Sequence, residues 1–106
     1  MMDMALLERL CRTNGVSGDE GRVREIILSE IKDCADSVTV DGMGNVLAFK
    51  KGRNPAKTKL LLSAHMDEVG FIVTDITRDG MLSVEPVGGI DRRVVCGKPV
   101  TVGPRA

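Results

Sequence analysis

The spacing of apolar residues divides the chain into a helical first third and a remainder built from short strands. Between residues 3 and 13 apolar positions recur every three or four residues, which predicts a short amphipathic helix. The pair Asn14-Gly15 is a plausible left-handed stop for this helix. A second apolar stripe predicts a helix over residues 18–35, and Ser17 and Glu20 have the spacing of a capping box at its start.

After residue 36 the apolar period changes to two, as in half-buried strands. Residues 37–40 and 46–50 flank the glycine-rich turn DGMGN and predict a hairpin. A second hairpin is predicted over residues 70–87, where GFIVTDI and MLSVEPV flank TRDG. The segment VVCGKPVTVG, residues 94–103, is typical of a further strand pair.

Between the two hairpins lies the unbroken apolar run KLLLSA, residues 59–64. Such a run suits a central strand buried on both faces, in a sheet covered by helices. The preceding basic segment KKGRNPAKTK contains Pro55 and has no apolar period, so we interpret its lysines as a solvated connection rather than a phosphate site. The fold class indicated is α/β, and the change to short strands near residue 70 is the best candidate for a domain boundary.

Composition and charge exclude several partners. Lys plus Arg and Asp plus Glu number 15 each, so no net field attracts nucleic acid or an anionic membrane. Two Phe and no Trp or Tyr leave few rings on which single-stranded bases could stack. Three cysteines without a C-x-x-C pair favour a reducing, cytoplasmic compartment over a disulfide framework. No segment has the roughly 20 apolar residues of a membrane span, so we expect a soluble protein.

The only histidine, His65, follows the apolar run and begins the triplet H-x-D. In an extended segment alternate side chains share a side, so Asp67 would lie beside His65. A carboxylate that accepts the second ring N–H of a histidine is a common arrangement at metal sites. The alternative is a core histidine that is simply hydrogen-bonded to its neighbour, and the spacing alone does not exclude it. A catalytic zinc needs about three protein ligands, and no spacing recruits the others here.

The longer context decides between these interpretations. LLLSAHMDEVGFIV and DGMLSVEPVGGIDRRVVCGKPVTV closely resemble the tetrahedral and glutamyl aminopeptidases, dinuclear metallopeptidases of which some have been labelled endoglucanases. GVSGDEGRVREII and the D-x-x-G-N of Asp41, Gly44 and Asn45 resemble the N-terminal region of the same family. The resemblance covers nearly the whole chain, with the motifs in order.

The resemblance implies that His65 binds one of two divalent metal ions, zinc or cobalt, and that Asp67 orients it. It implies a helix-covered mixed sheet in a catalytic domain that begins with residues 1–70. Residues 71–106 would then start an inserted, barrel-like β domain used in assembly, with VGGID as a structural turn. Peptides would be the substrate, and the complete protein would form homo-oligomers from dimers to dodecamers.

The same resemblance implies groups that cannot be assigned in this chain. These are a bridging aspartate, two further carboxylate ligands, a second histidine and a glutamate that acts as general base. We therefore expect the isolated chain to bind zinc weakly, to hydrolyse nothing, and to be oligomeric or marginally stable because its strand edges are unpaired. The alternatives are a non-catalytic assembly or binding module and a glucan hydrolase.

Overall fold

The computed structural model describes residues 3–54 and 58–103 of the chain. Its first helix, α1 (Met4–Arg12), is confirmed as an amphipathic helix and begins where the Asp3 carboxylate accepts hydrogen bonds from the Ala5 and Leu6 amides. It does not end in a left-handed residue as predicted. Thr13 is extended (φ −90°, ψ 125°), and its hydroxyl donates to the Arg9 carbonyl, which satisfies one of the last carbonyls without a glycine.

The second helix, α2 (Gly21–Ile31), is shorter at both ends than the predicted range of 18–35. The capping box is wrong: the Glu20 carboxylate accepts a hydrogen bond from the Gly18 amide, and Ser17 bonds elsewhere. At the other end the Cys34 and Ala35 amides both bond to the Ile31 carbonyl, which closes the helix in a turn. Local competition for the terminal backbone groups therefore sets both limits.

Both predicted hairpins are confirmed. Strands β1 (Ser37–Val40) and β2 (Val46–Phe49) pair antiparallel, with Ser37 opposite Phe49. Strands β3 (Gly70–Ile76) and β4 (Leu82–Val87) also pair antiparallel, with an irregularity in register between Val73 and Asp75. The α/β class is thus correct. Within the described residues, however, the strands form two separate two-stranded sheets and not one mixed sheet.

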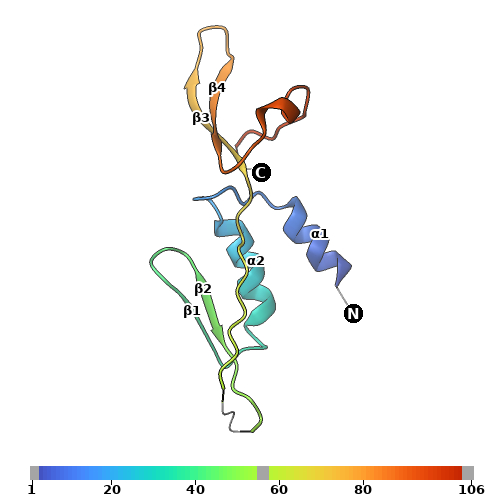
Figure 1. Ribbon diagram of the computed structural model, residues 1–106, viewed down its shortest axis with the longest axis vertical. Helices are drawn as coiled ribbons and strands as arrows, with labels where there is room; N and C mark the ends of the chain where they lie inside the picture. Colours follow the sequence, from blue (N-terminus) through green and yellow to red (C-terminus); the bar gives the residue numbers. More distant parts are fainter. Residues whose placement is uncertain (1–2, 55–57, 104–106) are drawn as a thin grey trace.

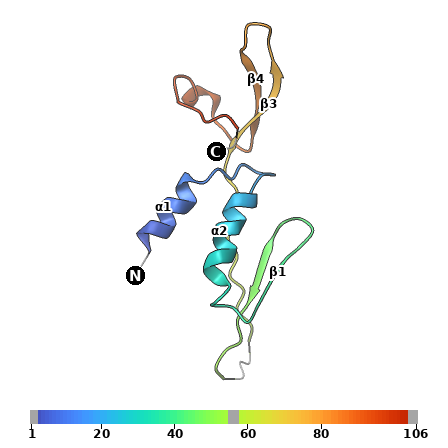
Figure 2. The ribbon, with the colours of Figure 1, turned by 180° about the vertical axis from the view of Figure 1, so that it is seen from behind.

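The predicted central strand is not formed. Residues 58–67 run extended beside α2 and lead up to the β3–β4 hairpin (Figures 1 and 2), and none of them belongs to a strand. Leu60, Leu61 and Leu62 are 85–87% exposed. An apolar run is compatible with burial on both faces. Burial also requires neighbouring strands, and the described residues form none that pairs with this segment. Pro55, from the predicted loop, lies outside the described residues.

The predicted strand pair over residues 94–103 is also wrong. Its start lies in a short 3₁₀ helix, η1 (Arg92–Val94), and no strand follows in the described part of the segment. The Asp91 carboxylate accepts a hydrogen bond from the Arg93 amide at 3.0 Å and pairs with its guanidinium. This local cap starts a helical turn that overrides the β preference of the adjacent valines.

The described residues bury little apolar surface. Val23 of α2 is their only buried hydrophobic side chain, and it packs against Gly15. The molecule is elongated, measuring 64 × 30 × 28 Å, with α1, α2 and β1–β2 toward one end and β3–β4 with η1 at the other (Figure 1). No helix in the described chain is both long and apolar enough to cross a membrane.

Candidate metal centre

Backbone pairing joins the loop before α2 to the segment that carries the histidine. The Glu68 amide donates to the Gly15 carbonyl at 2.8 Å, and the Ser17 amide donates to the Glu68 carbonyl at 3.3 Å. Val16 and Glu68 form a parallel bridge, and the Glu68 carboxylate accepts a further bond from the Gly15 amide. We call these contacts the latch. They hold residues 15–17 against residues that lie about 50 positions later in the chain.

Two glycines allow the latch to close. A Cβ on Gly15 would lie 2.6 Å from Cγ2 of the buried Val23, and a Cβ on Gly70 would overlap the Val16 side chain. Neither glycine has a positive φ. The requirement at both positions is therefore close approach rather than an unusual backbone conformation.

Asp67 lies directly beside the imidazole of His65. Nδ1 of His65 lies 2.9 Å from the Asp67 carbonyl oxygen and 3.0 Å from its Oδ1. Both partners only accept hydrogen bonds, so Nδ1 carries the proton and Nε2 of the neutral ring carries the lone pair. The His65 side chain is 85% exposed. Among the described residues the ring is therefore not packed in a core, and no hydrogen-bond partner of Nε2 is found there.

Ser17 holds the other oxygen of the same carboxylate. Its hydroxyl donates to Asp67 Oδ2 at 2.5 Å. This bond first, and then the one with His65, keeps the pKa of Asp67 below its ordinary value of 3.8. Asp67 is thus an ionised acceptor between a serine and a histidine. Sequence reasoning missed Ser17 because the S-x-x-E spacing suggested a helix cap.

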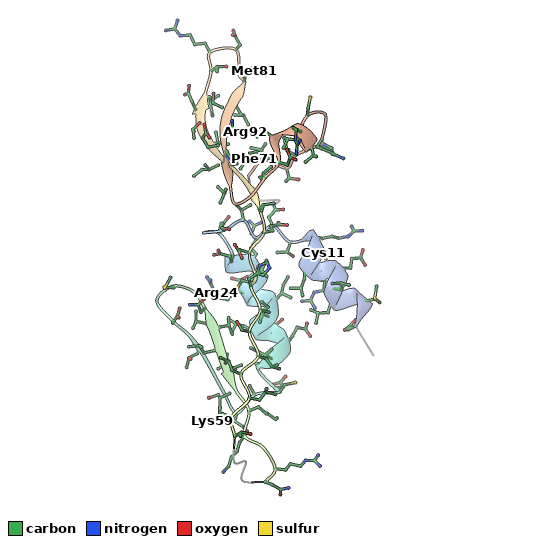
Figure 3. All side chains as sticks on the ribbon, viewed as in Figure 1. Cys11, Arg24, Lys59, Phe71, Met81 and Arg92 are labelled. Carbon is green, nitrogen blue, oxygen red and sulfur yellow. The ribbon has the colours of Figure 1, made fainter. Side chains whose placement is uncertain are left out.

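The β1–β2 turn lies next to the histidine. A cavity of about 140 Å³ is lined by Ala64 to Asp67, by Met43, Gly44 and Asn45 of this turn, and by Glu20. The Asp41 carboxylate accepts hydrogen bonds from the Met43 and Asn45 amides and from the Asn45 side chain. Arg24 of α2 donates to the Gly44 carbonyl, and Figure 3 shows its place between α2 and the hairpin. The D-x-x-G-N motif therefore forms one wall of the cavity.

Acidic residues of the later segments do not complete a metal site with His65 in the part of the chain that the structure describes. Asp75 and Glu85 belong to the β3–β4 hairpin, and Asp91 is paired with Arg93. Across residues 3–54 and 58–103 no three His, Cys, Asp or Glu side chains are grouped as a metal site. The described residues therefore offer one imidazole with a neighbouring carboxylate, and not a complete ligand set.

The match to known proteins is specific. Residues 44–106 fit the family described as M42 glutamyl aminopeptidase. The chain belongs to this family. It is 41% identical over 91 residues to the lysyl aminopeptidase of Pyrococcus furiosus, a match that covers 85% of the chain and 25% of that enzyme.

Solved structures agree with this membership. The endoglucanase of Thermotoga maritima superposes with a TM-score of 0.80 and 51% identity, over 87% of this chain and 29% of that one. PhTET1-12s, described as a dodecamer, gives 0.72 and 41%, over 86% and 27%. This M42 chain therefore spans less than a third of the length of each of these relatives.

M42 enzymes are metallopeptidases that need divalent metal ions. The residues at His65 suit such an ion. The imidazole is largely exposed, and its Nδ1 is fixed by a carboxylate, which is the usual support of a metal-binding histidine. Among the described residues, the imidazole of His65 would supply one ligand to such an ion.

Proposed function

We propose that this chain is the N-terminal part of a metal-dependent aminopeptidase, in which His65 is a metal ligand and Asp67 orients it. The observation that supports the proposal best is the hydrogen bonding of the imidazole: Nδ1 is engaged by Asp67, while Nε2 has no partner among the described residues, on a side chain that is 85% exposed. The proposal also draws on the similarity to a lysyl aminopeptidase along 85% of the chain.

The cofactor would be two divalent ions in the complete active site, zinc or cobalt. When bound, such ions polarise the scissile carbonyl and activate water. The role of the chain's own residues is to orient the imidazole that binds the ion. Asp67 keeps the proton on Nδ1, so that Nε2 is the nitrogen presented to the ion. The latch keeps Glu68 against the loop before α2, which limits the movement of the segment that carries the ring.

The domain arrangement forms part of the same proposal. Residues 1–70 would begin the catalytic α/β domain with its mixed sheet, and residues 71–106 would begin an inserted β-rich, barrel-like domain. The start of β3 at Gly70 and the position of β3–β4 at the far end of the molecule support this division. Peptides would be the substrate.

Assembly and location extend the proposal further. The dodecamer described for PhTET1-12s supports homo-oligomerisation of the complete protein. The exposed, unpaired thiols of Cys11, Cys34 and Cys96 favour a cytoplasmic location. Neither nucleic acid nor membrane is expected as a partner, given the balanced charge.

The name of the Thermotoga relative makes glucan hydrolysis the second candidate. Glycoside hydrolases use two carboxyl groups across the scissile bond. Beside His65 the carboxylate of Asp67 is already bonded to Ser17 and to the imidazole, so it is poorly placed to attack or protonate a sugar. The peptidase proposal explains this engagement, because an orienting carboxylate must hold its histidine.

A chimera tests the function. This chain would replace the aligned segment of the Pyrococcus furiosus lysyl aminopeptidase, and the purified protein would be assayed on aminoacyl amides and on a soluble β-glucan. We expect amide hydrolysis that is lost in His65→Ala with the fold retained by circular dichroism. Glucan hydrolysis alone, or a folded chimera whose peptidase activity survives His65→Ala, would contradict the proposal. The isolated chain should hydrolyse neither substrate.

A further inference from the structure

We propose that Ser17 is a positioning residue for the metal-binding imidazole, because it fixes the Asp67 carboxylate and through it the tautomer and rotation of His65. The inference rests on the proposed role of His65. It adds a residue from a distant part of the sequence, 50 positions from the carboxylate that it contacts.

The carboxylate needs a second anchor. Asp67 is 39% exposed, so water can compete for its oxygens and the group can rotate about its last bond. Oδ1 faces His65, and Ser17 holds Oδ2 at 2.5 Å. With both oxygens engaged, rotation of the carboxylate would break two hydrogen bonds rather than one, so the orientation that serves Nδ1 is favoured.

Ser17 is itself held by the backbone. Its amide donates to the Glu68 carbonyl, and the neighbouring Gly15 is buried against Val23 of α2. The hydroxyl is therefore positioned by the latch. A continuous path leads from the small buried contact at Val23 through Gly15 and Ser17 to the exposed ring.

A helix-capping role does not account for Ser17. Glu20 precedes α2 without a side-chain cap from Ser17, and the Glu20 carboxylate bonds to the Gly18 amide. The hydroxyl of Ser17 points to Asp67 instead. Its one observed side-chain partner in the described structure is thus the carboxylate that supports His65.

The single histidine makes the test unambiguous. The 106-residue chain, labelled with ¹⁵N only in histidine, gives the two ring nitrogen signals of His65 and no others. At mildly alkaline pH, where a neutral imidazole is expected, the wild-type chain should show a protonated Nδ1 and an unprotonated Nε2. The signals of Ser17→Ala should move toward those of Asp67→Ala, which retains only the backbone carbonyl as an acceptor.

Ser17→Thr keeps the hydroxyl and should restore the wild-type signals. Ser29→Ala is the matched control, because Ser29 also donates a side-chain hydrogen bond but to the Ile26 carbonyl within α2. A zinc titration followed at Nε2 should show affinity falling by up to about tenfold in Ser17→Ala, the lower end of the effect of supporting groups at metal sites.

Three results would overturn the inference or its basis. If Ser17→Ala matches wild type while Asp67→Ala shifts the signals, Ser17 does not position the ring. If the ring signals of Ser17→Ala change only together with loss of the Gly15 and Glu68 amide signals, followed in a second, uniformly ¹⁵N-labelled sample, Ser17 merely supports the latch. If Asp67→Ala also leaves the signals unchanged, Asp67 does not orient His65 and the proposed function fails as well.

Discussion

At the scale of single residues, the chemistry of the candidate site depends on which nitrogen of one imidazole is free. The spacing of H-x-D is compatible with the contact between His65 and Asp67, because both lie close together in one extended segment. Ser17 has no such local relation to them. Its contact exists only because the latch brings two distant segments together, and no periodicity within either segment encodes that pairing.

Asp41 permits a pH prediction at this scale. The side-chain amide of Asn45 is the main cause that lowers the pKa of Asp41 below 3.8. Because the folded pKa is depressed, the charged carboxylate stabilises the turn fully above pH 3.8, and that contribution is lost as the pH falls through the folded value.

We expect the Asn45 side-chain amide signals to follow a single titration with its midpoint below 3.8, measured by NMR. A midpoint for Asp41 at or above the ordinary value would contradict the hydrogen bonding described for the turn.

At the scale of elements, local patterns predicted α1, α2 and both hairpins. The local patterns gave wrong predictions where a strand needs a neighbouring strand to pair with, or where a side chain bonds to the backbone and starts or ends a helix. The apolar run Leu60–Leu62 is typical of a strand, but no strand pairs with it in the described chain. Near Asp91, a side-chain cap starts a 3₁₀ helix in place of the predicted strand. The ends of α2 were missed because Ser17 and Glu20 bond to groups other than those of a capping box.

The latch is the element-scale feature that most needs a test. Gly15→Ala places a methyl group within 2.6 Å of Val23 Cγ2, so either α2 or the loop must move. Overpacking of this kind costs about 1–3 kcal/mol. We expect faster hydrogen exchange at the Glu68 amide, which donates to Gly15, by about 5- to 150-fold if the whole cost falls on the latch.

Gly42→Ala is the matched control, because no atom lies within 4 Å of its added Cβ and its φ is not positive. It should leave the Glu68 amide unchanged. Equal exchange rates in Gly15→Ala and Gly42→Ala would show that the latch does not depend on the close approach of Gly15 to α2.

At the scale of the whole molecule, the chain is less compact than a globular domain of the same length. Its accessible surface is 9548 Å², against about 5,800 Å² expected for a compact monomer of this mass. Its radius of gyration is 18.2 Å, against about 13 Å for a compact domain of this length. Exposed leucines on an unpaired extended segment add to this surface and favour association.

We therefore expect the purified chain to associate as its concentration rises, measured by sedimentation velocity. Replacing Leu60 and Leu62 by lysine should weaken the association, because charge on an open strand edge opposes pairing. Met81→Lys, an exposed change at the tip of the β3–β4 hairpin (Figure 3), should have a smaller effect. A monodisperse monomer that unfolds cooperatively would contradict this expectation.

The central claim is that Nε2 of His65 binds a divalent ion while Nδ1 stays protonated against Asp67. The most direct measurement is a zinc titration of the ¹⁵N-histidine chain with Cys11, Cys34 and Cys96 replaced by serine, which removes the exposed competing thiols. The account predicts weak, saturable displacement of the Nε2 signal with Nδ1 still protonated. Ring signals that do not respond to zinc, or coordination through Nδ1, would contradict it.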